Sequence, residues 1–279
     1  MEWRKIIQDT KLDRNKVIMK RYIVLICYIS FFLCLLPPSF LYSSWPKVSI
    51  ITSVYNGDEF IEGFMEDITR QTIFADCQLI MINANSPGNE EAVIKKYMKH
   101  YPNIVYIRLN ADPGLYGVWN MAIKMAQGKL LTNANLDDRL APNCYEIHYN
   151  TLQAHQEIDL VYSPCFLTHT PNQLFNTHNK HKMLPCPQFS KEALKKVCIP
   201  NSHPMWRKSM HAQYGLFDEK YKIAGDWEMW LRAVSQGSKF MRIDQPLGLY
   251  YVNPKGLSTD PKKEPAKEAH IIYEKYKNI

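Results

Sequence analysis

Hydrophobic residues follow two alternating periods along residues 47–134. Four short runs of aliphatic and β-branched residues, bounded by turn residues, predict β-strands; they cover residues 47–55, 77–83, 104–109 and 129–134. The segments between them space apolar residues at helical intervals and predict helices at residues 58–71, 90–100 and 118–126. Strands that alternate with helices are typical of parallel sheets covered by helices. The pattern therefore predicts an α/β fold with a mostly parallel sheet flanked by helices.

An acidic turn follows the fourth predicted strand. The sequence Asn133-Ala-Asn135-Leu-Asp137-Asp138 places two carboxylates side by side there. Ligands of open α/β sheets bind at the carboxyl ends of the strands, and carboxylates suit a divalent ion that also contacts substrate phosphates. An ordinary solvent-exposed turn explains the same six residues, so both interpretations stay open at this point.

The net charge of +7 is unevenly distributed. Residues 1–21 form a basic segment with a net charge of +4, which leaves only +3 for the other 258 residues. Binding to a nucleic-acid backbone needs a concentrated basic face, and the body of the chain has no such run. The sequence therefore argues against nucleic acid as a partner.

An apolar segment without charges follows the basic residues. It runs from Tyr22 to Pro46, is most apolar over residues 22–36, and predicts a single-pass transmembrane anchor at residues 22–44. A signal peptide is the alternative, but Leu41 and Tyr42 are too large for a small-x-small cleavage site. The basic flank favours a cytoplasmic N-terminus, with the rest of the chain across the membrane. The side on which that remainder lies stays open.

Cysteine and histidine residues do not form a recognisable metal motif. Seven cysteines are scattered without a C-x-x-C pair, which favours free thiols over a disulfide framework or a zinc site. Residues 169–188 are polar and hold His169, His178 and His181. Without a thiolate pair or a firm helix, this region is better interpreted as a mobile loop than as a zinc site.

Four signals in a fixed order resemble a family 2 glycosyltransferase with a GT-A fold. They are the strand that ends at Tyr55-Asn56, the second strand with its polar end, Gly114 with Asn120, and the acidic turn. The resemblance covers about residues 46–260 and implies a Rossmann-like GT-A domain. It implies inverting transfer of a sugar from a nucleotide sugar, UDP- or GDP-linked, to a hydroxyl of a glycan or lipid acceptor. The implied cofactor is Mn²⁺ or Mg²⁺.

The resemblance also assigns nucleotide contacts. They are Thr52, Tyr55, Asn56, Asn83, Asn85, Asn120 and Asn135. The chain departs from the family pattern at Asn83 and Asn85, where an acidic pair is usual. An amide can donate and accept hydrogen bonds but supplies no charge. The base and donor preference therefore stays open.

At the acidic turn the resemblance makes Asp137 the metal ligand. Asn135 replaces the first carboxylate of the family's D-x-D-D pattern, and Asn253 stands where a further histidine ligand is often found. An amide oxygen can still assist a divalent ion. The remaining expected donor or acceptor contacts are Asp138, Gly114, His203, Trp206 and Arg232. Residues 169–188 would then be an acceptor loop.

Asp226 is the expected general base. It opens a predicted helix that also carries Arg232, which matches the family's acid followed by an arginine, although Gly225 replaces the preceding glutamate. A helix cap is the alternative role for Asp226, and it is compatible with the first. Beyond residue 260, the alternating charges of residues 261–279 predict an exposed helical tail.

Two other functions stay in consideration. The amides at Asn83, Asn135 and Asn253 would suit a catalytically silent GT-A-like protein that binds nucleotide or acts as a membrane scaffold. A nucleotidyltransferase would need a glycine-rich, basic triphosphate loop after the first strand, and the sequence Tyr55-Asn56-Gly57-Asp58 is not one.

Overall fold

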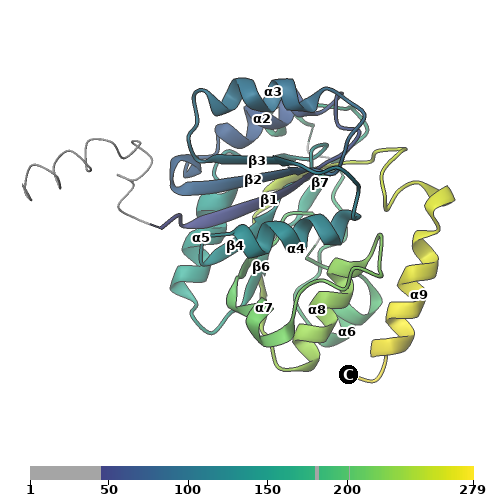
Figure 1. Cartoon of the computed structure of the whole chain (residues 1–279). Helices are drawn as coiled ribbons and strands as arrows, with labels where there is room; N and C mark the ends of the chain where they lie inside the picture. The colour runs from purple at the N-terminus through teal and green to yellow at the C-terminus, as the bar shows by residue number, and fades with distance from the viewer. Residues whose placement is uncertain (1–44, 180–181, 201) are drawn as a thin grey trace, which may run out of the picture. The chain divides into compact units, whose positions relative to one another are not determined.

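The computed structural model describes residues 45–179, 182–200 and 202–279. A seven-stranded sheet lies at its centre, in the order β3-β2-β1-β4-β8-β6-β9. Figure 1 labels β1 to β4 and β6 of this sheet. Its strands are β1 (Val48–Val54), β2 (Cys77–Asn83), β3 (Ile104–Arg108), β4 (Leu130–Asn133), β6 (Leu160–Tyr162), β8 (Met205–Arg207) and β9 (Phe240–Arg242). The four strands predicted from the sequence are β1 to β4, and all four are parallel. The expected α/β fold with a mostly parallel sheet is confirmed.

Pairing changes direction in the second half of the sheet. Strand β8 is antiparallel to both of its neighbours, β4 and β6, and β6 is parallel to β9. A second, three-stranded sheet has the order β5-β10-β7, with β5 (Arg139–Leu140), β10 (Gly248–Tyr251) and β7 (Cys165–Thr168). Strand β5 follows the acidic turn directly. The small sheet therefore holds the turn from its C-terminal side.

Helices cover both faces of the main sheet. One apolar core lies under α2 (Ile61–Thr69), α3 (Glu90–Met98) and α5 (Cys144–Ala154). The other lies under α4 (Leu115–Met125), α6 (Lys191–Lys196), α7 (Ser209–Tyr214), α8 (Gly225–Ser235) and α9 (Pro265–Tyr276). Short 3₁₀ helices occur at η2 (Phe74–Asp76), η3 (Phe175–Thr177) and η4 (Pro261–Lys263). Successive strand residues point to opposite faces, so Ile50 belongs to the first core and Ile51 to the second.

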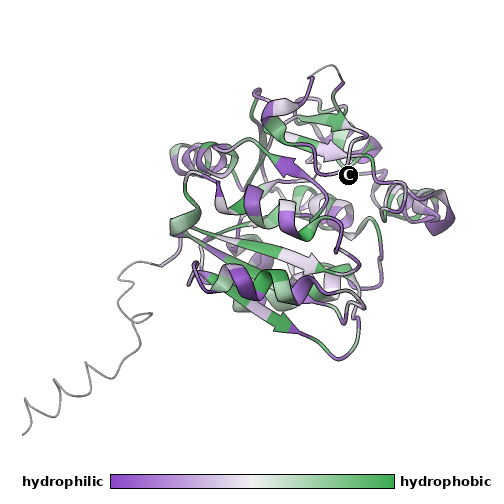
Figure 2. Cartoon of the chain, turned by 90° about the horizontal axis from the view of Figure 1, so that it is seen from above, coloured by the Kyte–Doolittle hydropathy of each residue, from purple (hydrophilic) through white to green (hydrophobic). Residues whose placement is uncertain are grey.

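Hydropathy explains this layering. Figure 2 shows mostly hydrophobic residues along the central strands, whereas the helices alternate hydrophilic and hydrophobic positions. In β2 all seven residues are buried, because helices cover both faces of a parallel sheet. In α2 the buried residues Ile61, Phe64, Met65 and Ile68 form one helical stripe. The same amphipathic pattern made these helices predictable.

The charged C-terminal residues form helix α9, as their charge pattern predicts. The helix is not simply exposed, because Ile272 and Tyr276 are buried against the second core. The predicted anchor at residues 22–44 and the basic segment 1–21 lie outside the described residues. Among the residues that are described, no helix has the length and apolar character needed to cross a membrane. Among the described residues, Cys77, Cys144, Cys165 and Cys186 are free thiols, as expected.

Candidate active site

A cavity of about 1740 Å³ lies at the carboxyl ends of β1 and β4. Strand order reverses at this point of the sheet, since β1 leads on to β2 on one side and pairs with β4 on the other. Such a switch point is where open α/β sheets bind ligands. The walls include the end of β1, the start of α4, the acidic turn, the loop after α6, the start of α8 and the chain after β10.

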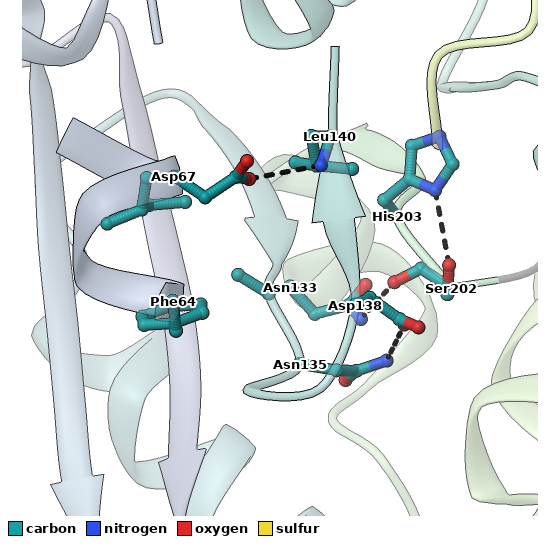
Figure 3. A pocket seen from close by; sticks show the side chains of 10 residues that line it. Phe64, Asp67, Asn133, Asn135, Asp138, Leu140, Ser202 and His203 are labelled. Carbon is teal, nitrogen blue, oxygen red and sulfur yellow. Dashed lines mark hydrogen bonds between the residues drawn. The ribbon is translucent and has the colours of Figure 1, made fainter. Parts of the chain in front are cut away.

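Asp138 fixes the acidic turn to the small sheet. Its Oδ2 accepts a hydrogen bond from Asn135 Nδ2 at 3.0 Å (Figure 3), and its Oδ1 accepts one from the backbone N–H of Tyr251 in β10 at 3.1 Å. Burial and the neighbouring Asp137 carboxylate raise the pKa of Asp138 to about 7. Because both of its oxygens have protein partners, Asp138 serves to shape the turn.

Asp137 faces the cavity and is hydrogen-bonded to Asn253, the residue that stands where the family often has a histidine ligand. Asn253 Nδ2 donates to Asp137 Oδ2 at 2.8 Å, although 116 residues separate the two. The Asn253 Oδ1 accepts the backbone N–H of Lys255 at 2.9 Å. Asn253 therefore meets Asp137 with its nitrogen, as a hydrogen-bond partner and not as an oxygen ligand.

The residues of the turn fit a hard divalent cation. Asp137 and Asn135 both line the cavity and offer oxygen atoms, the donors that Mg²⁺ and Mn²⁺ prefer. Burial raises the pKa of Asp138, and repulsion from the adjacent Asp137 carboxylate adds to that rise. A cation beside Asp137 would relieve that repulsion.

Asp226 lies in the first turn of α8 and lines the same cavity. Its Oδ1 accepts the backbone N–H of Trp227 at 2.8 Å and lies 3.1 Å from the Tyr116 hydroxyl. Its Oδ2 lies 3.7 Å from the Cys198 thiol. Burial raises the pKa of Asp226, and these hydrogen bonds oppose the rise. Ala224, and not Asp226, occupies the cap position, so the cap role that the sequence also allowed is wrong.

Helix α9 holds the loop that leads to Asp226. The Glu268 carboxylate accepts three consecutive backbone N–H groups, from Lys222 at 2.7 Å and from Ile223 and Ala224 at 2.9 Å. These three residues line the cavity. A carboxylate near the start of a helix also interacts favourably with the helix dipole. The C-terminal helix therefore shapes the wall around the expected base, a role that sequence reasoning missed.

A buried carboxylate ties α9 to α8 a turn further on. Glu228 is only 1% exposed and accepts hydrogen bonds from Tyr276 Oη at 2.7 Å and Lys275 Nζ at 2.8 Å. Arg232 makes an ion pair with it at 3.0 Å. These partners hold the pKa of Glu228 below its usual value, although burial opposes them. The ion pairs and hydrogen bonds of Glu228 therefore hold α9 against α8, the helix that carries Asp226.

Three of the expected nucleotide-side residues line the cavity: Tyr55, Asn56 and Asn135. Tyr55 is 47% exposed, so its ring is available to a ligand. Asn56 has a φ of +49°, a conformation that asparagine tolerates better than most residues. Gly114, also expected at the site, caps α4 with a φ of +81° and lines the cavity.

Four other expected nucleotide contacts do not line the cavity. Thr52 is fully buried inside β1. Asn83 is fully buried, and its Oδ1 accepts the backbone N–H of Ser86 at 2.7 Å. Asn120 is 2% exposed and binds the backbone of Phe217 and the carboxylate of Glu219. Asn85 is exposed but lies outside the cavity lining. Burial inside the fold keeps Thr52, Asn83 and Asn120 away from the cavity surface, which contradicts their expected direct contacts. The contact expected of Asn85 stays a prediction.

Three expected donor or acceptor contacts are structural. Trp206 has no exposed surface, and its Nε1 donates to His211 Nε2 at 2.9 Å. Arg232 is engaged with Glu228 and with carbonyl oxygens of the preceding loop. His203 is 2% exposed and lies behind the acidic turn, where it lines a water-sized cavity of about 10 Å³ with Asp138 (Figure 3). None of the three reaches the large cavity.

Tyr116 and Cys198 are site residues that sequence reasoning missed. Both touch Asp226, and both line the cavity. Tyr116 follows Gly114 by two residues, so its place in the first turn of α4 was a usable signal. Cys198 carried none, because it lies in a loop and 28 residues separate it from Asp226.

The curated relatives include a minor teichoic acid biosynthesis protein and proteins named as glycosyltransferases. The chain is 27% identical to the minor teichoic acid biosynthesis protein GgaB of Bacillus subtilis over 215 residues, which cover 75% of this chain but 23% of GgaB. It is 26% identical to the uncharacterized glycosyltransferase EpsJ of the same organism over 243 residues, 81% of this chain and 67% of EpsJ. The chain therefore spans only about a quarter of the first of these relatives.

Solved structures share the fold at low sequence identity. The S. aureus TarS fragment 1–349 in complex with UDP aligns with a TM-score of 0.64 at 15% identity, over 81% of this chain and 64% of that one. The mannosyltransferase PcManGT from Pyrobaculum calidifontis, in complex with GDP-Man and Mn²⁺, aligns with a TM-score of 0.64 at 13% identity, over 84% and 67%. The model of glycosyl transferase family 2 matches residues 49–209, more than half of the chain. The chain belongs to glycosyl transferase family 2 and has a GT-A fold.

Proposed function

We propose that this protein transfers a sugar, with inversion, from a nucleoside-diphosphate sugar to a hydroxyl of a glycan or lipid acceptor. The observation that carries the proposal is the placement of Asp137 and Asp226 on the walls of one cavity, one at the end of β4 and the other at the start of α8. Family membership and neighbours solved with UDP, UDP-GlcNAc and GDP-Man support a nucleotide-sugar donor.

Asp226 would act as the general base. Its carboxylate takes the proton of the acceptor hydroxyl, and the oxygen attacks the anomeric carbon from the side opposite the leaving diphosphate, which inverts that centre. Burial makes the carboxylate more basic than a free aspartate, which suits proton transfer near neutral pH. Tyr116 and the Trp227 N–H hold its Oδ1 in place.

Asp137, assisted by Asn135, would hold Mn²⁺ or Mg²⁺. When bound, the ion neutralises negative charge on the departing diphosphate. Asp138 keeps the turn in position through Asn135 and Tyr251. Tyr55 and Asn56 lie on the side of the cavity where the resemblance expects the nucleoside, and the exposed Tyr55 ring offers a stacking surface.

Two substitutions test these roles separately. Asp226→Asn should abolish transfer while leaving donor binding intact, because it removes only the proton acceptor. Asp137→Ala should remove the metal dependence of donor binding. Asp244→Asn is the matched control, since Asp244 is 76% exposed and pairs only with groups remote from the cavity lining. Normal turnover in either site variant would refute the assignment.

The donor can be identified by thermal unfolding. A ligand that binds only the native state stabilises it, by about 2.7 kcal/mol when the ligand concentration is 100 times its dissociation constant, and so raises the unfolding midpoint. We expect UDP or GDP to raise the midpoint more with Mn²⁺ than without it. If neither diphosphate shifts the midpoint under either condition, the donor assignment fails.

A catalytically silent protein is the second candidate. Asn253 presents its NH₂ group to Asp137, and Asn135 and Asn83 are amides where acids are usual in the family. Slow hydrolysis of a UDP- or GDP-sugar in the presence of Mn²⁺, lost in Asp137→Ala, would exclude this candidate. Donor binding without any turnover on glycan or lipid acceptors would favour it.

We also propose that residues 22–44 anchor the chain in a membrane as a single span. The support is the uncharged apolar sequence after a basic segment. Extraction of membranes at alkaline pH should leave the full chain in the pellet, and a chain that begins at residue 46 should be released. Protease protection in sealed vesicles would then assign the side. Release of the full chain at alkaline pH would contradict the anchor.

A further inference from the structure

Nitrogen and sulfur ligands gather in the interior behind the acidic turn. Cys144 and His148 come from α5, and His203 comes from the loop before β8. One potential ligand atom from each of these residues lies within 4.8 Å of the other two. Cys144 and His148 have no exposed surface, and His203 is 2% exposed. The three side chains therefore converge on one point of the core.

The arrangement follows from the fold. Cys144 and His148 are four residues apart, so they project from the same face of α5. The rings of His148 and His203 lie parallel, with centroids 5.7 Å apart and an interplanar angle of 5°. A second thiol, Cys165 of β7, lies 3.3 Å from His203 Nδ1. Cys165 therefore lies against His203, beside the group that Cys144, His148 and His203 form.

Hydrogen bonds leave one nitrogen of this group without a partner. Ser163 Oγ lies 3.1 Å from His148 Nε2 and 3.0 Å from His203 Nε2. His148 Nδ1 is buried and has no hydrogen-bond partner. An unpaired polar atom in the interior is costly, and a metal ion would satisfy it. Burial lowers the pKa of both histidines, that of His203 to about 4, so both rings are neutral and carry a lone pair.

We propose that Cys144, His148 and His203 bind a zinc ion in the interior of the protein, with Cys165 as the fourth ligand. Imidazole and thiolate donors suit Zn²⁺, which has bonds of about 2.0–2.1 Å to nitrogen and about 2.3 Å to sulfur in tetrahedral sites. Such bonds place ligand atoms closer together than the observed limit of 4.8 Å, so the side chains must close in slightly. On binding, each ligating thiol loses its proton to solvent.

This site is separate from the oxygen site at Asp137. Its donors are nitrogen and sulfur, which select a different class of metal from the carboxylate and amide oxygens of the acidic turn. His203 also lines the small cavity that Asp138 lines, so an ion here would stiffen the floor of the turn. The role of the ion would be structural, because all of its ligands are buried and a structural ion needs no open path to the large cavity.

Metal analysis and cobalt substitution of the full chain test the proposal. We expect about one equivalent of zinc in the purified protein, or uptake of one Zn²⁺ after stripping, with a rise in the unfolding midpoint. Co²⁺ should give a thiolate charge-transfer band, because sulfur is a ligand. Cys144→Ser should weaken zinc binding at least about tenfold and weaken the cobalt band, and His148→Gln should weaken zinc binding while keeping the thiolates.

Control variants separate this site from the proposed active site. Cys77→Ser changes a buried thiol elsewhere in the core, and it should keep the zinc and the cobalt band. Asp137→Ala should also keep both, even if transfer is lost or was never present. Protein that neither contains zinc nor binds Zn²⁺ or Co²⁺ overturns the proposal. Unchanged zinc affinity in folded Cys144→Ser and His148→Gln overturns it as well.

Discussion

Replacement of Glu268 by glutamine tests whether helix α9 positions the loop that precedes Asp226. The Glu268 carboxylate accepts three backbone N–H groups, from residues 222, 223 and 224. Glutamine keeps the length of the side chain and one acceptor oxygen. Its NH₂ group, however, must face at least one backbone donor, and the negative charge at the helix start disappears.

The size of the effect follows from these contacts. A hydrogen bond to a charged group contributes about 1.5–3 kcal/mol, and part of that loss is recovered because water reaches this half-exposed site. We therefore expect Glu268→Gln to lower the free energy of unfolding by about 2 kcal/mol. In a domain of this size, about 1 kcal/mol shifts the unfolding midpoint by about 2–4 °C, so the midpoint should fall by about 4–8 °C.

Calorimetry and kinetics together decide the outcome. If the proposed transferase activity holds, kcat should fall in Glu268→Gln while the dissociation constant of the nucleoside diphosphate stays unchanged, because the loop borders Asp226 and not the acidic turn. Glu274→Gln is the matched control on the same helix, since its exposed ion pair with Lys277 should contribute nothing measurable. A midpoint for Glu268→Gln equal to that of the control would refute the reasoning.

Burial raises the pKa of Asp67 from 3.8 to about 6, so the folded protein binds this proton more tightly than the unfolded chain does. The free energy of unfolding should therefore fall by about 2–3 kcal/mol as pH rises from about 4 to about 6. Denaturant titrations of Asp67→Asn should lack that fall. Asn135→Asp should lower the unfolding midpoint without metal, because it places a carboxylate where an amide now donates to Asp138 at 3.0 Å. The same variant should bind Mn²⁺ more tightly in calorimetric titration. Weaker Mn²⁺ binding would contradict the assignment of the acidic turn as the metal site. Tyr116→Phe removes a hydrogen bond that lowers the pKa of Asp226, so the acidic limb of the kcat/KM profile should move to higher pH, and a limb that moves the other way would argue against Asp226 as base.

The first half of the fold was predictable because its signals are local. Strands β1 to β4 are apolar runs with turn residues at their ends, and the helices between them carry amphipathic stripes. The later strands β6, β8 and β9 have only three residues each, too few to show a period. The small sheet was equally invisible, since β5 has two residues.

The site was predictable only in part. Asp137 and Asp226 reach the cavity because their motifs lie at the end of a strand and the start of a helix. Asn120 and Arg232 matched the family pattern too, yet both bind backbone and carboxylate groups of the protein itself. Their partners cannot be identified from spacing, since the partner of Asn120 at Phe217 is 97 residues away. A polar residue in the right motif therefore does not by itself face the ligand.

The hydrogen bonds that fix the acidic turn determine when this turn can reach its native conformation during synthesis. Asp138 is held by Tyr251 and Asp137 by Asn253, across 113 and 116 residues. During synthesis the carboxylates leave the ribosome long before the segment that orients them. Contacts of such sequence separation form late, because a long loop must close first. A nascent chain therefore carries the whole β1 to β4 unit with an untethered turn until residue 253 has been made.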